Sequence, residues 1–61
     1  MEDYYKVYVV WENNNFALGI SPIAKMPDGH VVYEYWTKDL SDAKHDLQRV
    51  YNLISFIQKV V

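Results

Sequence analysis

Three polar side chains in the second half of the sequence are spaced so that they could share one side of a helix. Asp42, His45 and Asp46 stand three and four residues apart, and residues at those spacings are neighbours on a helical surface. Carboxylates and imidazoles bind divalent metals, but a site normally needs three or four ligands and a second layer of hydrogen bonds. The same pattern also fits an ordinary solvated face beside Lys44. We therefore predict no metal site.

A pair of carboxylates offers the second candidate chemistry. Glu12 and Glu34 fall on one face of the strands predicted below, where paired carboxylates could act as general acid and base. A sheet in a chain of 61 residues has no cleft to desolvate them. Ser21 and Ser41 have no evident base nearby, and the two glycines form no phosphate-binding loop. We therefore predict no catalytic residue, no cofactor and no enzymatic activity.

Composition bounds the class of protein. The 61 residues form one domain, 1–61, and a chain of this size buries only about 60% of its unfolded surface. The sequence is 51% hydrophobic and 16% aromatic, too apolar for a disordered chain, and it has no cysteine to form a disulfide. No stretch approaches the roughly 18 apolar residues of a membrane span, and the start MEDYYK lacks the basic residues of a signal peptide. We expect a globular, cytoplasmic protein that does not bind membranes.

The charge balance favours a protein partner over nucleic acid. Eight acidic residues face six lysines and arginines, which gives a net charge of −2, and the cations are scattered along the chain. Binding to a phosphate backbone depends on clustered cations. Nucleic acid is therefore the less favoured class of partner.

Three stretches alternate as β-strands and are rich in β-branched and aromatic residues. These stretches are residues 4–12, 16–21 and about 30–37. Asn13, Asn14 and Asn15 predict a tight hairpin between the first two, because Asn tolerates the left-handed conformation. Pro22 should end the second strand or place it at a sheet edge, and Pro27-Asp28-Gly29 predicts a turn before the third.

A helix is predicted after the third strand. Asp39 or Ser41 can cap its first turn, and Asp42 lies favourably near its N-terminus. One apolar stripe follows at spacings of three and four residues: Ala43, Leu47, Val50, Ile54, Ile57 and Val61. The predicted fold class is α+β, a three-stranded antiparallel sheet (β-β-β-α) with one long C-terminal helix packed on one face.

The strands carry apolar or aromatic residues on both faces, although one helix can cover only one face. We assign to the covered face Tyr5, Val7, Val9, Trp11, Phe16, Leu18, Ile20, Val31, Tyr33 and Tyr35. The other face, with nothing in the chain expected to cover it, holds the predicted partner-binding residues Tyr4, Tyr8, Val10, Glu12, Val32, Glu34 and Trp36. A contiguous aromatic patch usually marks an interaction site. The alternatives are amphipathic tyrosines on a merely wet face, exchanged faces, or a bulge at Gly19 that shifts the register.

A second apolar group lies to one side of the helical stripe. Leu53, Phe56 and Val60 form this group, and Phe56 lies about 140° from the centre of the stripe at about 100° per residue. The uncovered sheet face and Phe56 together expose more apolar surface than a small monomer should tolerate, and small domains gain most from self-association. We therefore predict a homodimer with these three residues as its seam, with the uncovered sheet face as the alternative dimer surface. The alternative is a stray Phe on a frayed last turn.

Two resemblances bear on function. The order of three strands and a helix, with TKDLSDAKHDL opening the helix, resembles the arm-binding domains of tyrosine recombinases, which bind DNA with the sheet. The resemblance implies a DNA-binding accessory domain. Those sheets are rich in Lys and Arg, whereas the corresponding face here offers Lys6 beside Glu12 and Glu34, so the functional residues do not carry over.

Residues 28–47, DGHVVYEYWTKDLSDAKHDL, are similar to the middle of the small phage-encoded uracil-DNA glycosylase inhibitors, which are acidic dimeric DNA mimics. The shared features are Asp28-Gly29, Tyr33-Glu34-Tyr35 and Leu40-Ser41-Asp42, over about a third of the chain. The inhibitors place a key aromatic directly after Ser-Asp, where this chain has Ala43, and they follow the helix with a strand.

The expected function is a small non-enzymatic protein-binding module. Its specific form would be a phage or mobile-element inhibitor that sequesters a host enzyme through the uncovered aromatic and acidic sheet face. The alternatives are the DNA-binding accessory domain and a purely structural homodimer subunit.

Overall fold

The computed structural model describes residues 4–25 and 28–60, with the side chains of residues 59 and 60 excepted. The elements are β1 (Tyr5–Glu12), β2 (Asn15–Pro22), β3 (His30–Thr37) and α1 (Leu40–Val60). They form an antiparallel three-stranded sheet followed by one helix packed against it, so the predicted α+β fold is confirmed. Within the described part of the chain, no helix is both long and apolar enough to cross a membrane.

A two-residue turn joins β1 to β2. Asn13 and Asn14 have φ angles of 55° and 63°, the positive values that a tight hairpin turn of type I′ requires at both central positions. Asn15 belongs to β2, where it pairs with Glu12. The asparagine-rich stretch therefore sets the register of the hairpin.

The strand order is β2-β1-β3, with β1 in the centre. Pro22 ends β2, which is an edge strand, so its missing N–H interrupts no interior ladder. The central strand pairs Val7 with Tyr35 and Val9 with Tyr33, and these residues lie on the face that α1 covers. The core therefore forms between β1 and the helix.

A bulge in β3 changes the predicted faces. Val9 pairs with Tyr33, but the next residue, Val10, pairs with Val31. Val32 is the extra residue, and it lines a groove on the helix side of the sheet. The prediction that Val31 faces the helix and Val32 faces away is therefore wrong, because one inserted residue reverses the alternation at that point.

The start of α1 and most of its buried stripe follow the prediction. The Asp39 Oδ1 atom accepts a hydrogen bond from the Ser41 N–H at 3.0 Å, so Asp39 caps the helix. Ala43 and Val50 are buried, and Leu47 and Ile54 are half-buried. The two last members differ: Ile57 is 54% exposed, and Val61 lies outside the described residues.

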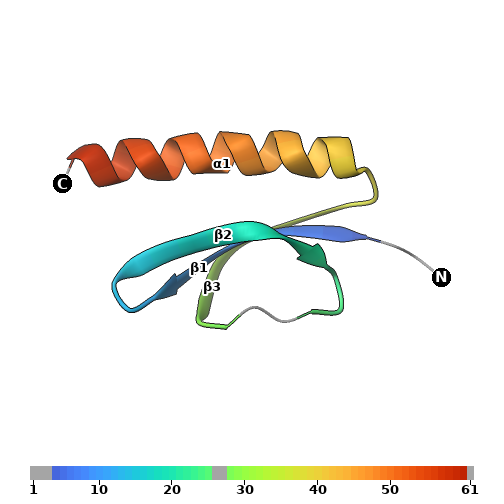
Figure 1. The fold of residues 1–61 in the computed structure, drawn as a ribbon, viewed down its shortest axis with the longest axis horizontal. Helices are drawn as coiled ribbons and strands as arrows, with labels where there is room; N and C mark the ends of the chain where they lie inside the picture. The colour runs from blue at the N-terminus through green and yellow to red at the C-terminus, as the bar shows by residue number, and fades with distance from the viewer. Residues whose placement is uncertain (1–3, 26–27, 61) are drawn as a thin grey trace.

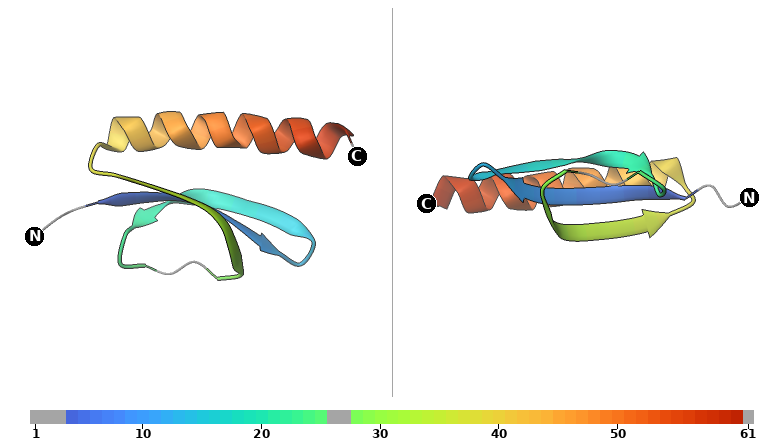
Figure 2. Two further views of the ribbon diagram at one scale, coloured as in Figure 1. Left: turned by 180° about the vertical axis from the view of Figure 1, so that it is seen from behind. Right: turned by 90° about the horizontal axis from the view of Figure 1, so that it is seen from below.

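The two faces of the sheet are covered by different segments of the chain. Figure 1 shows α1 on one side of the sheet and, on the other, residues 23–25 and 28–29 of the β2–β3 connection. Figure 2 shows the same arrangement from behind. The expectation that nothing in the chain covers the second face is therefore wrong. Of the predicted turn before β3, Pro27 lies outside the described residues, while Gly29 has a φ of 94°, a conformation that favours glycine.

Candidate functional site

The face of the sheet opposite α1 carries most of the residues predicted to bind a partner. Its register is set by β1 and β3, which place Lys6 beside Trp36 and Tyr8 beside Glu34. Residues paired across antiparallel strands point to the same face. The structure therefore brings Tyr8, Glu34 and Trp36 together on one surface.

Lys6 is the most unusual residue on this face. Its side chain is only 3% exposed, and its ammonium group donates to the carbonyl oxygen of Lys25 at 2.7 Å and of Ile23 at 3.4 Å. Both carbonyls belong to the β2–β3 connection. The sequence suggested an exposed cation here, whereas the ammonium instead holds the connection against the sheet.

Two further residues of the predicted site have structural environments. A Cβ atom added to Gly19 would lie 3.0 Å from the Tyr8 hydroxyl oxygen, so the Tyr8 ring lies over the bare backbone of β2. Val10 is 3% exposed and pairs with Val31 and Ala17. Val10 therefore contributes packing and no accessible surface. Tyr8 packs on β2 but is only half-buried, so part of its ring stays accessible.

The accessible part of this face is concentrated at β3. Trp36 is 55% exposed, and Glu34 is exposed two residues before it on the same face. Tyr4 is half-buried, and the Lys38 ammonium lies 5.3 Å from the centre of its ring, within the range of a cation–π interaction. These side chains form an aromatic surface at a sheet edge, with the exposed carboxylate of Glu34 and the ammonium of Lys38 beside the rings.

Glu12 does not join that surface. It lies at the far end of β1, beside Gly29, where a Cβ on the glycine would be 3.2 Å from the Glu12 Cβ. Glu34 pairs with Tyr8, four residues or about 13 Å along the strand from Glu12. The two carboxylates predicted to share a face are therefore too far apart to act as an acid–base pair.

The aspartates considered as metal ligands are engaged with tyrosines of β3. Tyr35 Oη donates to Asp42 Oδ2 at 2.7 Å, and Tyr33 Oη donates to Asp46 Oδ2 at 2.7 Å. Arg49 Nη2 adds hydrogen bonds to Asp46 Oδ1 at 2.9 Å and to Tyr33 Oη at 3.1 Å. Within residues 4–25 and 28–60, no group of three His, Cys, Asp or Glu could hold a metal ion. Asp42 and Asp46 therefore hold α1 against the edge strand β3 through hydrogen bonds from its two tyrosines.

These hydrogen bonds perturb the titration of their partners. The bond from Tyr35, then that from Thr37, lowers the pKa of Asp42 below its ordinary value. The same bond to Asp42 is the main cause that raises the pKa of Tyr35, while burial and the bond to Asp46 raise the pKa of Tyr33. The Tyr35–Asp42 bond therefore stabilises the state in which the carboxyl group is charged and the phenol neutral.

Tyr35→Phe should move the pKa of Asp42 upward, toward its ordinary value. Because the folded-state pKa is lowered, the bond stabilises the fold above the ordinary Asp pKa, and this contribution is lost as the pH falls through the lowered value. Wild type and variant should therefore differ in stability at neutral pH and converge in acid. NMR titration of the Asp42 carboxyl carbon, with urea unfolding at several pH values, measures both effects. An Asp42 titration that is identical in the two proteins would contradict the assignment.

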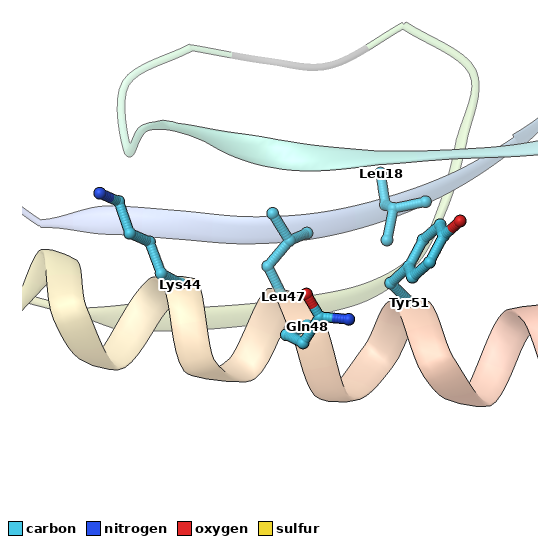
Figure 3. Close-up of a pocket in the computed structure, with 5 residues that line it drawn as sticks. All are labelled: Leu18, Lys44, Leu47, Gln48 and Tyr51. Carbon is cyan, nitrogen blue, oxygen red and sulfur yellow. The ribbon is translucent and has the colours of Figure 1, made fainter.

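A groove lies between α1 and β2. It has a volume of about 550 Å³ and is lined by Leu18, Lys44, Leu47, Gln48 and Tyr51. Figure 3 shows Leu18 of β2 pointing toward the helix, with the Tyr51 ring beside it and Leu47 directed toward the sheet. The sequence placed Leu18 and Leu47 in a closed core, but both are half-buried and line an open groove.

A second, more apolar groove lies on the β3 side of α1, with a volume of about 420 Å³. Val32, predicted for the opposite face, is 50% exposed and lines this groove. Leu53 lines it too, and Phe56 lies on the next helical turn with 68% of its surface exposed. The side chain of Val60, the third predicted seam residue, lies outside the described part of the structure.

The placement of Val32 in the same groove as Leu53 depends on the bulge in β3, for which the doublet Val31-Val32 gives no sequence signal. No protein-family model, curated protein or solved structure matches this chain.

Proposed function

We propose that this chain is a non-enzymatic protein-binding module, and that the sheet face opposite α1 binds the partner with Trp36 as its anchor. The observation that carries the proposal is the 55% exposure of Trp36 on a face where Lys6 and Val10 are buried. Tryptophan is among the residues that dominate interface energetics. An exposed indole at an edge strand is therefore a strong candidate for an interface residue.

The charge beside Trp36 indicates what kind of surface would complement it. Glu34 is exposed next to it on the same face, and the chain as a whole has a net charge of −2. Complementary charge around an aromatic anchor mainly sets specificity and association rate. The proposed partner therefore has a basic rim around a pocket for an aromatic ring.

Sequestration of a host enzyme by a phage or mobile-element inhibitor is the more specific form of this proposal. A module of 61 residues can inhibit by covering an active site, without any chemistry of its own. The exposed indole of Trp36 and the carboxylate of Glu34 beside it are compatible with that mode. The resemblance of residues 28–47 to uracil-DNA glycosylase inhibitors motivates this version, and their acidic DNA mimicry suggests an enzyme that acts on DNA.

The burial of Lys6 weakens the alternative of a DNA-binding accessory domain. A sheet that binds DNA needs cations available to phosphates. Lys6, the cation expected on this face, is 3% exposed, and its ammonium donates to two backbone carbonyls. The exposed Glu34 adds repulsion toward phosphate.

Trp36→Ala should abolish tight partner binding and leave the fold intact. Immobilised wild type captures proteins from a lysate of the source cells, and the captured protein is identified, purified and titrated by calorimetry. We expect about a thirtyfold loss of affinity, which is the roughly 2 kcal/mol typical of a central interface Trp. The melting temperature should barely change, because exposed substitutions usually stay within about 0.5 kcal/mol.

Tyr51→Ala is the matched control, because Tyr51 is 54% exposed but lies on α1. It should bind the partner like wild type. An unchanged affinity in Trp36→Ala, or an equal loss in both variants, would refute the anchor. Binding to duplex DNA with an affinity that falls steeply with salt would instead support the DNA-binding alternative.

A further inference from the structure

The stretch of α1 from Val50 to Gln58 combines exposed apolar side chains with an uncharged sequence. From Val50 to Gln58 the helix has nine residues and no Asp, Glu, Lys, Arg or His. Within this stretch Leu53 is 51% exposed, Phe56 68% and Ile57 54%. Interface centres are depleted of charge and enriched in aromatic residues. This stretch of the helix therefore has the composition of an interface rather than of a solvated surface.

The sheet extends this surface beyond the helix. Figure 1 shows the β1–β2 hairpin curving away from the C-terminal half of α1, and a groove of about 420 Å³ opens on the β3 side. Its walls include Phe16, Val32, Leu53 and Ile57 together with Arg49, and Val32 is 50% exposed. We call Val32, Leu53, Phe56 and Ile57 the apolar patch.

The exposed area is larger than expected for a folded monomer. A compact protein of 7.3 kDa has about 4,200 Å² of accessible surface, whereas this chain exposes 4705 Å². The four patch side chains, each at least half exposed, supply roughly 400 Å² at the usual size of large apolar groups. Small specific interfaces bury about 600 Å² per partner, so the patch alone provides about two-thirds of that area.

We propose that the apolar patch binds a second copy of this chain, in a two-fold symmetric dimer in which Phe56 of each copy enters the groove of the other. Phe56 protrudes on the helical turn beside the groove, and Val32 and Leu53 offer it apolar walls. In a two-fold interface one surface meets itself, so a projection next to a matching groove is satisfied twice. Arg49 also lines this groove, but it pairs with Asp46 of its own copy at 2.9 Å. A second copy therefore offers Phe56 a mainly apolar groove, whereas the proposed partner of the Trp36 surface has a basic rim.

This inference is independent of the proposed function. The patch lies on the helix side of the sheet, whereas Trp36 lies on the opposite face. A dimer formed through the patch leaves both Trp36 surfaces accessible. Loss of dimerisation and loss of partner binding should therefore respond to different substitutions.

The first measurement is the mass of wild type by sedimentation at high micromolar concentration. We expect twice 7.3 kDa, and a melting temperature that rises with protein concentration, as for any folded dimer that dissociates on unfolding. Phe56→Glu and Val32→Arg should each sediment as monomers with native circular dichroism, with the dimer weakened at least about thirtyfold. Gln58→Glu is the control, since it adds the same charge at an exposed position near the same end of the helix.

Mixing the two disrupted variants tests the contact itself. In a dimer of one Phe56→Glu copy and one Val32→Arg copy, one groove joins the new carboxylate to the new guanidinium, and the other keeps the native Phe56 and Val32. We therefore expect the mixture to regain the double mass. A monomeric wild type, dissociation by Gln58→Glu, a dimer that survives both substitutions, or a mixture that stays monomeric would overturn the proposal.

Discussion

Val50→Asp should unfold this protein. Val50 is 6% exposed and lies with Val9 at the base of the groove between α1 and the sheet. An unpaired carboxylate at a buried position costs on the order of 3–5 kcal/mol. A domain of 61 residues has a total stability of only about 3–9 kcal/mol. Most of the molecules should therefore lose native circular dichroism near room temperature.

Asn52→Asp is the matched control for this change. It adds the same carboxylate to the same helix two residues later, at an exposed position where the Asn52 Oδ1 atom already accepts a hydrogen bond from Gln48. It should alter stability by no more than about 0.5 kcal/mol. Thermal unfolding followed by circular dichroism compares the two. Similar melting temperatures would show that α1 does not bury Val50 against the sheet.

The elements of this fold are predictable because each depends on neighbours in the sequence. Alternation along 4–12, 16–21 and 30–37 reflects a period of two, and the stripe from Ala43 reflects a period near 3.6. The paired asparagines and the Asp39 cap act within a few residues of their own positions. Such local signals survive in a single sequence.

The faces of the sheet were harder to predict, because they depend on pairing between distant residues. Val31 and Val32 are identical in type, so nothing in the doublet tells which one faces the helix. The choice is made by the bulge opposite Val9 and Val10, more than twenty residues away. A single extra residue reverses the alternation of side chains between the two faces. Val32 therefore lies in the helix-side groove and not on the predicted partner face.

The polar contacts show the same division between local and distant information. The spacing of Asp42 and Asp46 correctly predicts one helical side, but their partners, Tyr35 and Tyr33, come from β3. The sequence assigned those tyrosines to the covered face on the basis of hydrophobicity. Their hydroxyl groups add a reason for the residue type, because phenylalanine there would remove one hydrogen-bond donor from each carboxylate.

Lys6→Met should lower the stability of the whole domain and release the β2–β3 connection. Lys6 is separated by 17 and 19 residues from the carbonyls that it binds, and it is 3% exposed. Methionine preserves the apolar stem but removes the donor, so two partly buried carbonyl oxygens lose a charged hydrogen bond. A hydrogen bond to a charged group typically contributes about 1.5–3 kcal/mol to the free energy of unfolding. We expect a loss of about 2 kcal/mol, or roughly 10 °C in melting temperature for a domain of this size.

Lys25→Met is the matched control, because it removes an exposed ammonium from the same connection and keeps the backbone carbonyl that Lys6 binds. Its melting temperature should stay near that of wild type. If Lys6→Met has the same melting temperature as Lys25→Met, the hydrogen bonds from Lys6 contribute nothing to stability.

Amide hydrogen exchange separates a local opening of the connection from global unfolding. The Ile23 amide donates to the Tyr4 carbonyl at 3.3 Å and the Lys25 amide to the Pro22 carbonyl at 3.0 Å, so both report on the connection. In Lys6→Met their exchange should accelerate more than that of Val7 in the central strand, because local opening needs less free energy than unfolding. Equal acceleration at Ile23 and Val7 would mean that the lysine stabilises only the domain as a whole. Preferential opening would mean that Lys6 controls how much of the face around Tyr8 and Trp36 is accessible to a partner.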